Sequence, residues 1–246
     1  MPGLTRHLLY IMTLPFFYIN HNDSLQKKIM LDEDTSRHVV QVLRMKEGEE
    51  LNLTDGKGNL LTCKISSAHK KHCLVNVEGT RYKEQGPGKV SVAISLLKNS
   101  NRFEWFLEKA TEIGVSEIIP LICERTEKEK FRYDRMNQIC ISAMLQSQQC
   151  WLPLLHEPKE FKEAIKHSAA EQKFIAHCME GNRRALAHQQ ISTISHSLIF
   201  IGPEGDFTRE EVELALQNNF VPLSLGETRL RTETAGVVAA ALLCYY

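Results

Sequence analysis

The sequence has no net charge, no paired-cysteine motif and no long hydrophobic run, and each absence excludes a class of protein. Thirty Lys and Arg residues balance thirty Asp and Glu residues, so binding to nucleic acid must depend on local basic patches. The seven cysteines are scattered and never form C-x-x-C, which argues against a disulfide framework and a zinc knuckle. No apolar stretch approaches the length of a membrane span, and no targeting signal is evident. These features predict a globular, cytoplasmic protein without a metal.

The first third of the chain is typical of a small β domain. Short strand-like segments fill residues 16–77, and the run Asp55-Gly56-Lys57-Gly58 indicates a hairpin, because glycine tolerates the positive φ of tight turns. One helical segment over residues 34–45 carries Val39, Val40 and Leu43 at helical spacing. We therefore predict a β-barrel-like domain over residues 14–84. Residues 1–13 are predicted to be an appendage, since Met12 restarts the chain just before the first strand.

Beyond the linker-like segment KEQGPGK, residues 83–89, apolar strands alternate with amphipathic helices. Strands are predicted at residues 90–97, 116–122, 173–178, 197–201 and 220–226, and helices at residues 101–114, 134–148, 159–167, 209–215 and 232–246. This alternation predicts an α/β domain over residues 89–246, with a mainly parallel sheet covered by helices on both faces.

Two glycine-bearing loops near the end of the chain are the candidate site. In FIGPEGDFTREEVELA, residues 200–215, a strand ends at Gly202–Gly205, and Thr208 with Glu211 predicts a helix that starts at Arg209. The next strand ends at Leu225-Gly226, and Thr232 is a plausible cap for the last helix. Neighbouring strand ends of this kind would form one crevice for a ligand. Either loop taken alone is equally compatible with a simple tight turn.

The crevice does not match the common phosphate cradles. The chain contains neither G-x-G-x-x-G nor G-x-x-x-x-G-K-[ST], and Glu204 would repel a phosphate. An acidic loop suits a ligand with hydroxyls or positive charge, such as an adenosine that carries a sulfonium and an amino group.

These loops closely resemble the C-terminal signature of the ribosomal RNA small subunit methyltransferase E family, within the SPOUT superfamily. The resemblance rests on residues 201–215 and 224–243, and it continues upstream in residues 37–58, 98–121 and 124–127. It implies an N-terminal PUA-like RNA-binding β-barrel, a SPOUT methyltransferase domain with a trefoil knot, and a homodimer. It also implies an S-adenosylmethionine-dependent enzyme that methylates N3 of one uridine in 16S ribosomal RNA.

The resemblance assigns roles to individual residues. The uridine N3 carries a proton, so a base or a cation that stabilises the developing anion must be near. Arg231 is the candidate cation, and Glu233 or Glu204 is a candidate base or cofactor ligand, although Arg231 could instead form a structural ion pair. The cofactor-binding residues implied by the two loops are Gly202, Pro203, Glu204, Gly205, Leu225, Gly226, Leu230, Thr232 and Thr234.

RNA contacts are expected from basic residues of both domains, which would bind phosphates while the target base turns into the pocket. The candidates are Arg37, His38, Arg44, Lys46, Lys98 and Arg102. His69 and His72 lack a third ligand nearby and are predicted to be surface residues instead of a metal site.

The chain departs from the family pattern at two places. Where the family reads Glu-Gln-Ser-Gly-Arg, residues 145–149 read LQSQQ, so Gln149 replaces an arginine and weakens the transfer of any RNA-contacting or catalytic role. Asp206 stands where a third glycine is usual, and we expect the following helix to absorb its charge. Two other functions stay open: an RNA methyltransferase of different specificity, for a ribose 2′-oxygen or another base, and a non-catalytic RNA-binding assembly protein.

Overall fold

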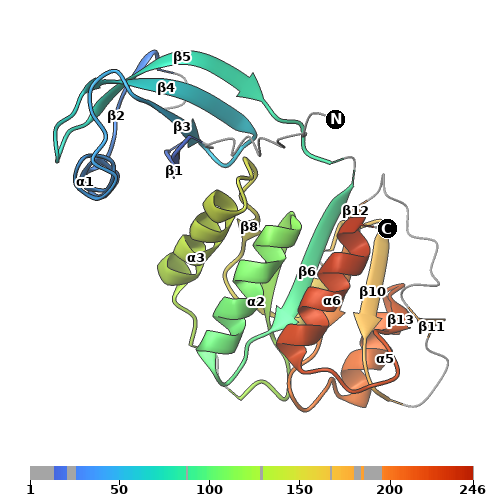
Figure 1. Ribbon diagram of the computed structural model, residues 1–246. Helices are drawn as coiled ribbons and strands as arrows, with labels where there is room; N and C mark the ends of the chain where they lie inside the picture. The colour runs from blue at the N-terminus through green and yellow to red at the C-terminus, as the bar shows by residue number, and fades with distance from the viewer. Residues whose placement is uncertain are drawn as a thin grey trace, which may run out of the picture. The chain divides into compact units, whose positions relative to one another are not determined.

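The computed structural model describes residues 14–20, 26–86, 88–127, 130–166, 168–179, 184–185 and 196–245. The predicted appendage, residues 1–13, lies outside this part of the chain, as does Tyr246 at the end of the predicted last helix. The chain divides into two compact units, residues 1–83 and 84–246, which are drawn in Figure 1.

The first unit is a five-stranded sheet in the order β1-β3-β4-β5-β2. Strand β1 pairs with β3 in parallel, and the other pairs are antiparallel. The sheet curls into a half-barrel, as Figure 1 shows, and it encloses a core that includes Ile29, Leu51 and Leu61. Its elements are β1 (Phe16–Tyr18), β2 (Lys28–Met30), α1 (Glu33–Arg37), η2 (His38–Val42), β3 (Glu50–Thr54), β4 (Asn59–Ser67) and β5 (Leu74–Tyr82).

The predicted hairpin at Asp55–Gly58 is confirmed. It joins β3 to β4, and Gly56 and Gly58 adopt φ values of 68° and 91°, which favour glycine. The Asp55 carboxylate accepts hydrogen bonds from the backbone N–H of Lys57 at 2.9 Å and from the side chain of Asn59 at 2.6 Å. The turn is therefore held by an aspartate that bonds residues directly after it.

The helical segment of this unit differs from the simple prediction. Helix α1, capped by Asp32, continues into the π-helical turn η2, in which the N–H of Leu43 bonds to the carbonyl of His38 at 2.9 Å. Val39 is buried, but the side chain of Leu43 points outward and Leu43 is 43% exposed. The wider turn shifts the register of later residues, so spacing that suits an α-helix no longer keeps Leu43 on the buried face.

The second unit is an eight-stranded parallel sheet with the main order β11-β13-β10-β12-β6-β7-β8, while β9 pairs with β7. The predicted α/β class and parallel sheet are confirmed. One helix was predicted over residues 159–167, but the described residues 159–166 form a short strand followed by a helix. The elements are β6 (Lys89–Ser95), α2 (Ser100–Ile113), β7 (Glu117–Ile122), α3 (Tyr133–Gln146), β8 (Leu154–Leu155), β9 (Lys159–Glu160), α4 (Phe161–Lys166), β10 (Gln172–Ala176), β11 (Arg184–Ala185), β12 (His196–Ile201), α5 (Arg209–Gln217), β13 (Val221–Ser224) and α6 (Thr232–Tyr245).

Helices cover both faces of this sheet. Figure 1 shows α2, α3 and α6 on one face, where Phe103, Phe106 and Leu107 form the centre of the core. Helices α4 and α5 pack on the other face around an aromatic cluster in which Phe207 contacts Phe161, with ring centroids 5.3 Å apart. Because Phe207 belongs to the loop after β12, this core also anchors one of the candidate loops. None of the described helices is long and apolar enough to cross a membrane.

Local sequence signals located the ends of these helices well. Gly114 ends α2 with a φ of 99°, and Thr208 with Glu211 forms the predicted capping box before Arg209. The last helix begins at Thr232, so Thr232 is its first residue and not its cap as predicted.

A polar cluster links β6, β7 and β12 at the amino-terminal edge of the sheet and includes His156, just after β8. Ser91 of β6 donates to the Glu117 carboxylate of β7, and its Oγ lies 2.7 Å from Nε2 of His196. Nε2 of His156 lies 2.6 Å from the other Glu117 oxygen. Burial alone would raise the pKa of Glu117, but the bonds from Ser91 and His156 hold it below its usual value. This cluster is structural and lies at the opposite edge from the candidate loops.

Candidate functional site

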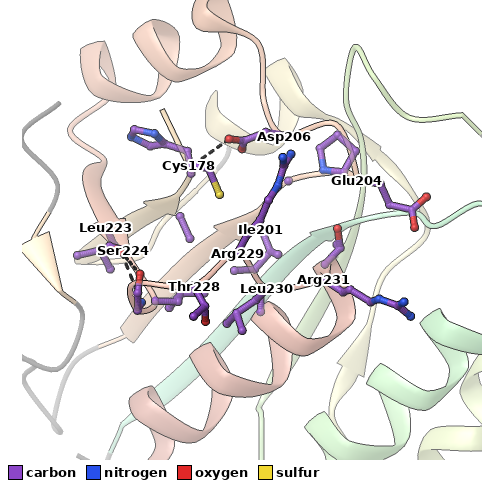
Figure 2. Close-up of a pocket in the computed structure, with 18 of the residues that line it drawn as sticks. Cys178, Ile201, Glu204, Asp206, Leu223, Ser224, Thr228, Arg229, Leu230 and Arg231 are labelled. Carbon is purple, nitrogen blue, oxygen red and sulfur yellow. Dashed lines mark hydrogen bonds between the residues drawn. The ribbon is translucent and has the colours of Figure 1, made fainter. Parts of the chain in front are cut away.

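A cavity of about 910 Å³ lies beyond the carboxyl ends of three neighbouring strands. Ile201 and Leu223 of β12 and β13 line it together with Cys178, which lies just after β10. The loops that follow β12 and β13 form much of its wall, as Figure 2 shows. The sheet order places β12 and β13 on either side of β10. The predicted crevice between the two glycine-bearing loops is present, but β12 and β13 are not neighbours in the sheet as predicted, because β10 lies between them.

The first loop, residues 202–208, depends on glycine because the backbone folds tightly over Phe207. A Cβ atom at Gly202 would lie 3.0 Å from Cδ2 of Phe207, and Phe207 is fully buried. A turn bond from the N–H of Asp206 to the carbonyl of Pro203, at 2.9 Å, closes the loop. Gly202 and Pro203 thus present bare backbone to the cavity.

Asp206 has a different role from the expected one. Its φ of 64° explains why glycine is usual here, and aspartate is one of the few other residues that tolerate this region. Its carboxylate accepts from the N–H of Cys178 at 2.7 Å and from the N–H of Phe207 at 2.9 Å. Thr208 caps helix α5 instead. The charge of Asp206 is therefore bound by two backbone amides and ties the loop to the end of β10.

The second loop, residues 225–231, leaves β13 through Gly226. The φ of Gly226 is 140°, and the Ser224 hydroxyl donates to the Gly226 carbonyl at 2.8 Å. No described atom lies within 4 Å of a Cβ added at this glycine, so the backbone conformation is what requires it. Figure 2 shows Thr228, Arg229 and Leu230 lining this side of the cavity.

Arg102 and Glu204, which line the cavity, meet Glu233, which lies outside the lining. We call these three residues the Arg102 cluster. The Arg102 guanidinium donates from Nε and Nη2 to the two Glu233 oxygens at 2.7 and 2.6 Å, and from Nη1 to Oε1 of Glu204. The side chain of Glu233 is 9% exposed, that of Arg102 is 24% exposed and that of Glu204 is 41% exposed. Arg102 and Glu233 therefore form a largely buried ion pair, whereas the carboxylate of Glu204 is accessible.

The electrostatics of the cluster follow from this packing. Burial alone would raise the pKa of Glu233, but the hydrogen bonds from Arg102 and from its own backbone amide hold it below its usual value. The bond to Glu233 in turn raises the pKa of Arg102, with a smaller contribution from Glu204. Arg102 was predicted to contact RNA phosphates, but its guanidinium is bound by two carboxylates at the cavity.

Most of the residues predicted to bind a cofactor line the cavity. They are Gly202, Pro203, Glu204, Leu225, Gly226, Leu230 and Thr232. Gly205 and Thr234 were also predicted but are not part of the lining. Arg231, the candidate cation, is exposed and lines the cavity, and Figure 2 shows its side chain extending to the same side as that of Glu204.

The other basic residues predicted to contact RNA are exposed. Lys98 pairs with Glu127 at 2.8 Å, and Arg37 pairs with Glu33 at 3.2 Å. His38 packs edge-on against Phe17, with ring centroids 5.7 Å apart. Arg44 and Lys46 lie beyond the helical segment, and Arg44 has a φ of 57°. His69 and His72 are stacked on each other on the surface of the first unit.

Arg125 supports the first loop, a role that sequence reasoning did not assign. Its Nη1 donates to the Gly205 carbonyl at 2.6 Å and to the Phe207 carbonyl at 3.4 Å. The neighbouring N–H of Glu124 donates to the Glu211 carboxylate at 2.9 Å. The only signal was the match of residues 124–127 to the family, because nothing local connects Arg125 to a loop about 80 positions away.

Gln149 has a structural role in this chain. Its side-chain amide donates to the carbonyls of Thr111 and Glu112 at 3.0 and 2.8 Å, which satisfies the last turn of α2. The preceding residue, Gln148, has a φ of 56°, which agrees with the glycine that the family carries there.

Comparison with known proteins identifies the family. The RNA methyltransferase domain family matches residues 84–244, and the RNA methyltransferase PUA domain family matches residues 31–78. A ribosomal RNA small subunit methyltransferase E from Bacillus subtilis is 29% identical over 222 residues, which cover 85% of this chain and 86% of the relative. The chain belongs to the ribosomal RNA small subunit methyltransferase E family.

Solved structures of the methyltransferase E family and its relatives share the fold. A probable rRNA-methyltransferase from Porphyromonas gingivalis is 37% identical, with a TM-score of 0.87 and coverage of 95% of this chain and all of that protein. The ribosomal RNA small subunit methyltransferase E of Neisseria gonorrhoeae, bound to S-adenosyl methionine, is 29% identical, with a TM-score of 0.82 over 93% of this chain and 95% of that protein. The PUA-like first unit and the methyltransferase second unit are confirmed. The trefoil knot and the homodimer stay predictions.

Proposed function

We propose that this protein uses S-adenosylmethionine to methylate N3 of a uridine in 16S ribosomal RNA of the small subunit. The observation that carries the proposal is the cavity in which two glycine-bearing loops meet the Arg102 cluster. Family membership supports RNA methylation, and the S-adenosyl methionine in the N. gonorrhoeae relative supports the choice of cofactor.

The cavity has the chemistry that this cofactor requires. Gly202 and Pro203 line the cavity, and the lack of a side chain at Gly202 lets a nucleoside approach main-chain groups there. Glycine is also required at this position because a Cβ atom would clash with Phe207. Two carboxylates and one guanidinium leave the Arg102 cluster with an excess of negative charge, which suits a cation. When bound, S-adenosylmethionine supplies a methyl group on a sulfonium. We propose that the cavity-lining loop residues hold S-adenosylmethionine. Gly205 and Thr234, which lie outside the lining, would support these residues.

We expect Arg125→Ala to weaken the binding of S-adenosylmethionine by about tenfold, which corresponds to about 1.4 kcal/mol. The substitution removes the hydrogen bonds that hold the carbonyls of Gly205 and Phe207, so the loop that contacts the cofactor loses its support. Calorimetric titration with S-adenosylmethionine measures the change, and the methylation rate at saturating cofactor should change much less. Arg132→Ala, an exposed arginine of the same connection, is the matched control. Equal affinity for the wild type and Arg125→Ala would show that the loop needs no such support.

Catalysis requires control of charge on the uracil ring. Loss of the N3 proton places negative charge on the two carbonyl oxygens, and a nearby cation lowers the energy of that anion. We propose that Arg231 provides this cation from the rim of the cavity. Glu233, whose two oxygens are both bonded to Arg102, acts by holding Arg102 in position and does not touch the base.

We propose that exposed basic residues bind RNA phosphates and that the target base turns into the cavity. Arg37, His38, Arg44 and Lys46 serve this purpose on the first unit, and Lys98 on the second. Arg102 is not among the proposed RNA-binding residues, because its guanidinium pairs with Glu204 and Glu233. The partners are then 16S ribosomal RNA or the small subunit, together with a second copy of the chain in a cytoplasmic homodimer.

Methylation of small subunits from a strain that lacks the gene tests the function. With purified protein and S-adenosylmethionine, we expect reverse transcription of 16S RNA to stop at one new position, because an N3 methyl group blocks Watson–Crick pairing. Methyl incorporation without a stop would indicate a ribose 2′-oxygen instead. No binding of S-adenosylmethionine in calorimetry would favour a non-catalytic RNA-binding role.

A further inference from the structure

We infer that Glu204 is the general base that removes the uridine N3 proton, and that Arg102 positions it. The inference deepens the proposed function and rests on it. It assigns the proton transfer to an accessible carboxylate of the Arg102 cluster, where the sequence alone had pointed first to Glu233.

The hydrogen bonds of the acidic residues at the cavity distinguish them. Both oxygens of Glu233 are bonded to Arg102, and its side chain is almost fully buried. Both oxygens of Asp206 accept backbone N–H groups. Glu204 is bonded to Arg102 through Oε1 only, and none of the described residues donates to its Oε2. Glu227 of the second loop also lines the cavity, but it is exposed and none of the described cations is bonded to it. Glu204 is therefore the cavity carboxylate that a cation holds in place and that still has an oxygen available for a substrate proton.

Charge balance also favours Glu204 as the acceptor. With both carboxylates ionised, the Arg102 cluster carries one positive and two negative charges. A proton on Glu204 leaves the buried pair of Arg102 and Glu233 intact and brings the cluster to neutrality. A proton on Glu233 would instead displace one of its two bonds from Arg102 and remove the negative charge of a largely buried ion pair, which is costly.

The arrangement also matches the hydrogen-bonding edge of uracil. That edge presents a carbonyl oxygen, the N3–H donor and a second carbonyl oxygen. The cavity offers a carboxylate acceptor, Glu204, together with the guanidinium donors of Arg231. Figure 2 shows Glu204 and Arg231 extending to the same side of the cavity. Cytosine has no proton at N3 and would meet the acceptor with a lone pair, so the same groups would discriminate against it.

The proton and electrons balance in this step. The N3–H bond breaks, its electron pair stays on nitrogen and the proton bonds to Oε2 of Glu204. The nitrogen then attacks the methyl carbon of the sulfonium, and the electron pair of the C–S bond returns to sulfur. Glu204 releases the proton to solvent after the methylated base leaves.

The test compares single-turnover methylation by the wild type and by Glu204→Gln at saturating S-adenosylmethionine. The amide oxygen of the introduced glutamine can still accept the hydrogen bond from Arg102, but the amide cannot act as a base. We expect the rate to fall by about 10²- to 10⁴-fold. The affinity for S-adenosylmethionine should weaken by no more than about tenfold, because the backbone of both loops still holds the cofactor after one negative charge is lost. Glu204→Asp, which keeps a carboxylate, should be intermediate. Glu213→Gln, the same change at an exposed position of α5, is the matched control.

An RNA that carries 5-fluorouridine at the target position provides the decisive comparison. Fluorine makes N3 more acidic, so a variant without its base should recover most of the lost rate on this substrate. The inference would be overturned if 5-fluorouridine did not reduce the loss of rate, or if weaker cofactor binding explained that loss. It would also be overturned if the rate fell in Glu227→Gln and not in Glu204→Gln. Absence of N3 methylation by the wild type would refute the proposed function itself.

Discussion

Arg231→Ala should slow methyl transfer at saturating S-adenosylmethionine by about 10²- to 10³-fold, the usual effect of removing one group that stabilises an oxyanion. The substitution removes the rim cation that faces the same side of the cavity as Glu204. Binding of S-adenosylmethionine should change little, because the backbone of the second loop contributes the cofactor contacts. Single-turnover kinetics with small subunits as substrate measure the effect.

The controls for Arg231 separate charge from structure. Arg231→Lys keeps the positive charge and should restore part of the rate, although lysine lacks the planar fork of arginine. Arg209→Ala removes an exposed arginine at the start of α5 and should leave the rate unchanged. If Arg231→Ala weakened cofactor binding and left the saturating rate intact, Arg231 would be a binding residue and not part of the chemistry.

Gly236→Ala should destabilise the second unit by roughly 2 kcal/mol, although alanine is the better helix former. Gly236 lies within α6, where a Cβ atom would approach Cε2 of Phe106 to 2.6 Å and Cδ1 of Ile94 to 2.9 Å. Both neighbours are fully buried in the core between α6, α2 and the sheet. The expected fall in Tm is about 4 to 8 °C for a unit of this size.

Tryptophan fluorescence measures this effect in the second unit alone, because Trp105 and Trp151 both lie there. Gly86→Ala is the matched control, since an added Cβ has no described atom within 4 Å. We expect that variant to unfold within about 0.5 kcal/mol of the wild type. If Gly236→Ala were as stable as the wild type or more stable, the close packing of α6 on Phe106 would be wrong.

Features that depend on a few consecutive residues were predictable from the sequence. The hairpin at Asp55–Gly58, the glycine stop at Gly114 and the capping box of Thr208 with Glu211 all formed as expected. Each is held by backbone conformation or by hydrogen bonds between residues at most four positions apart. Where a neighbouring turn alters the helical register, as η2 does before Leu43, the local pattern was misleading.

The chemistry of the site depended on contacts between distant residues. Arg102 meets Glu204 and Glu233 at separations of 102 and 131 residues, and Arg125 meets Gly205 at a separation of 80. These side chains come together because parallel strands place their carboxyl ends at one edge of the sheet. From the sequence alone, Arg102 was predicted only to contact RNA phosphates, and nothing indicated that it binds two carboxylates.

The sequence by itself determined the alternation of the longer strands and helices, the two glycine-bearing loops and the family to which they belong, because these depend on residue type and short spacing. Only the tertiary structure decided that Arg102 holds two carboxylates, that Glu204 keeps an accessible oxygen and that Gly236 has no room for a methyl group. The physical reason is that burial, ion pairing and packing depend on which elements the fold brings into contact, and those elements are far apart along the chain.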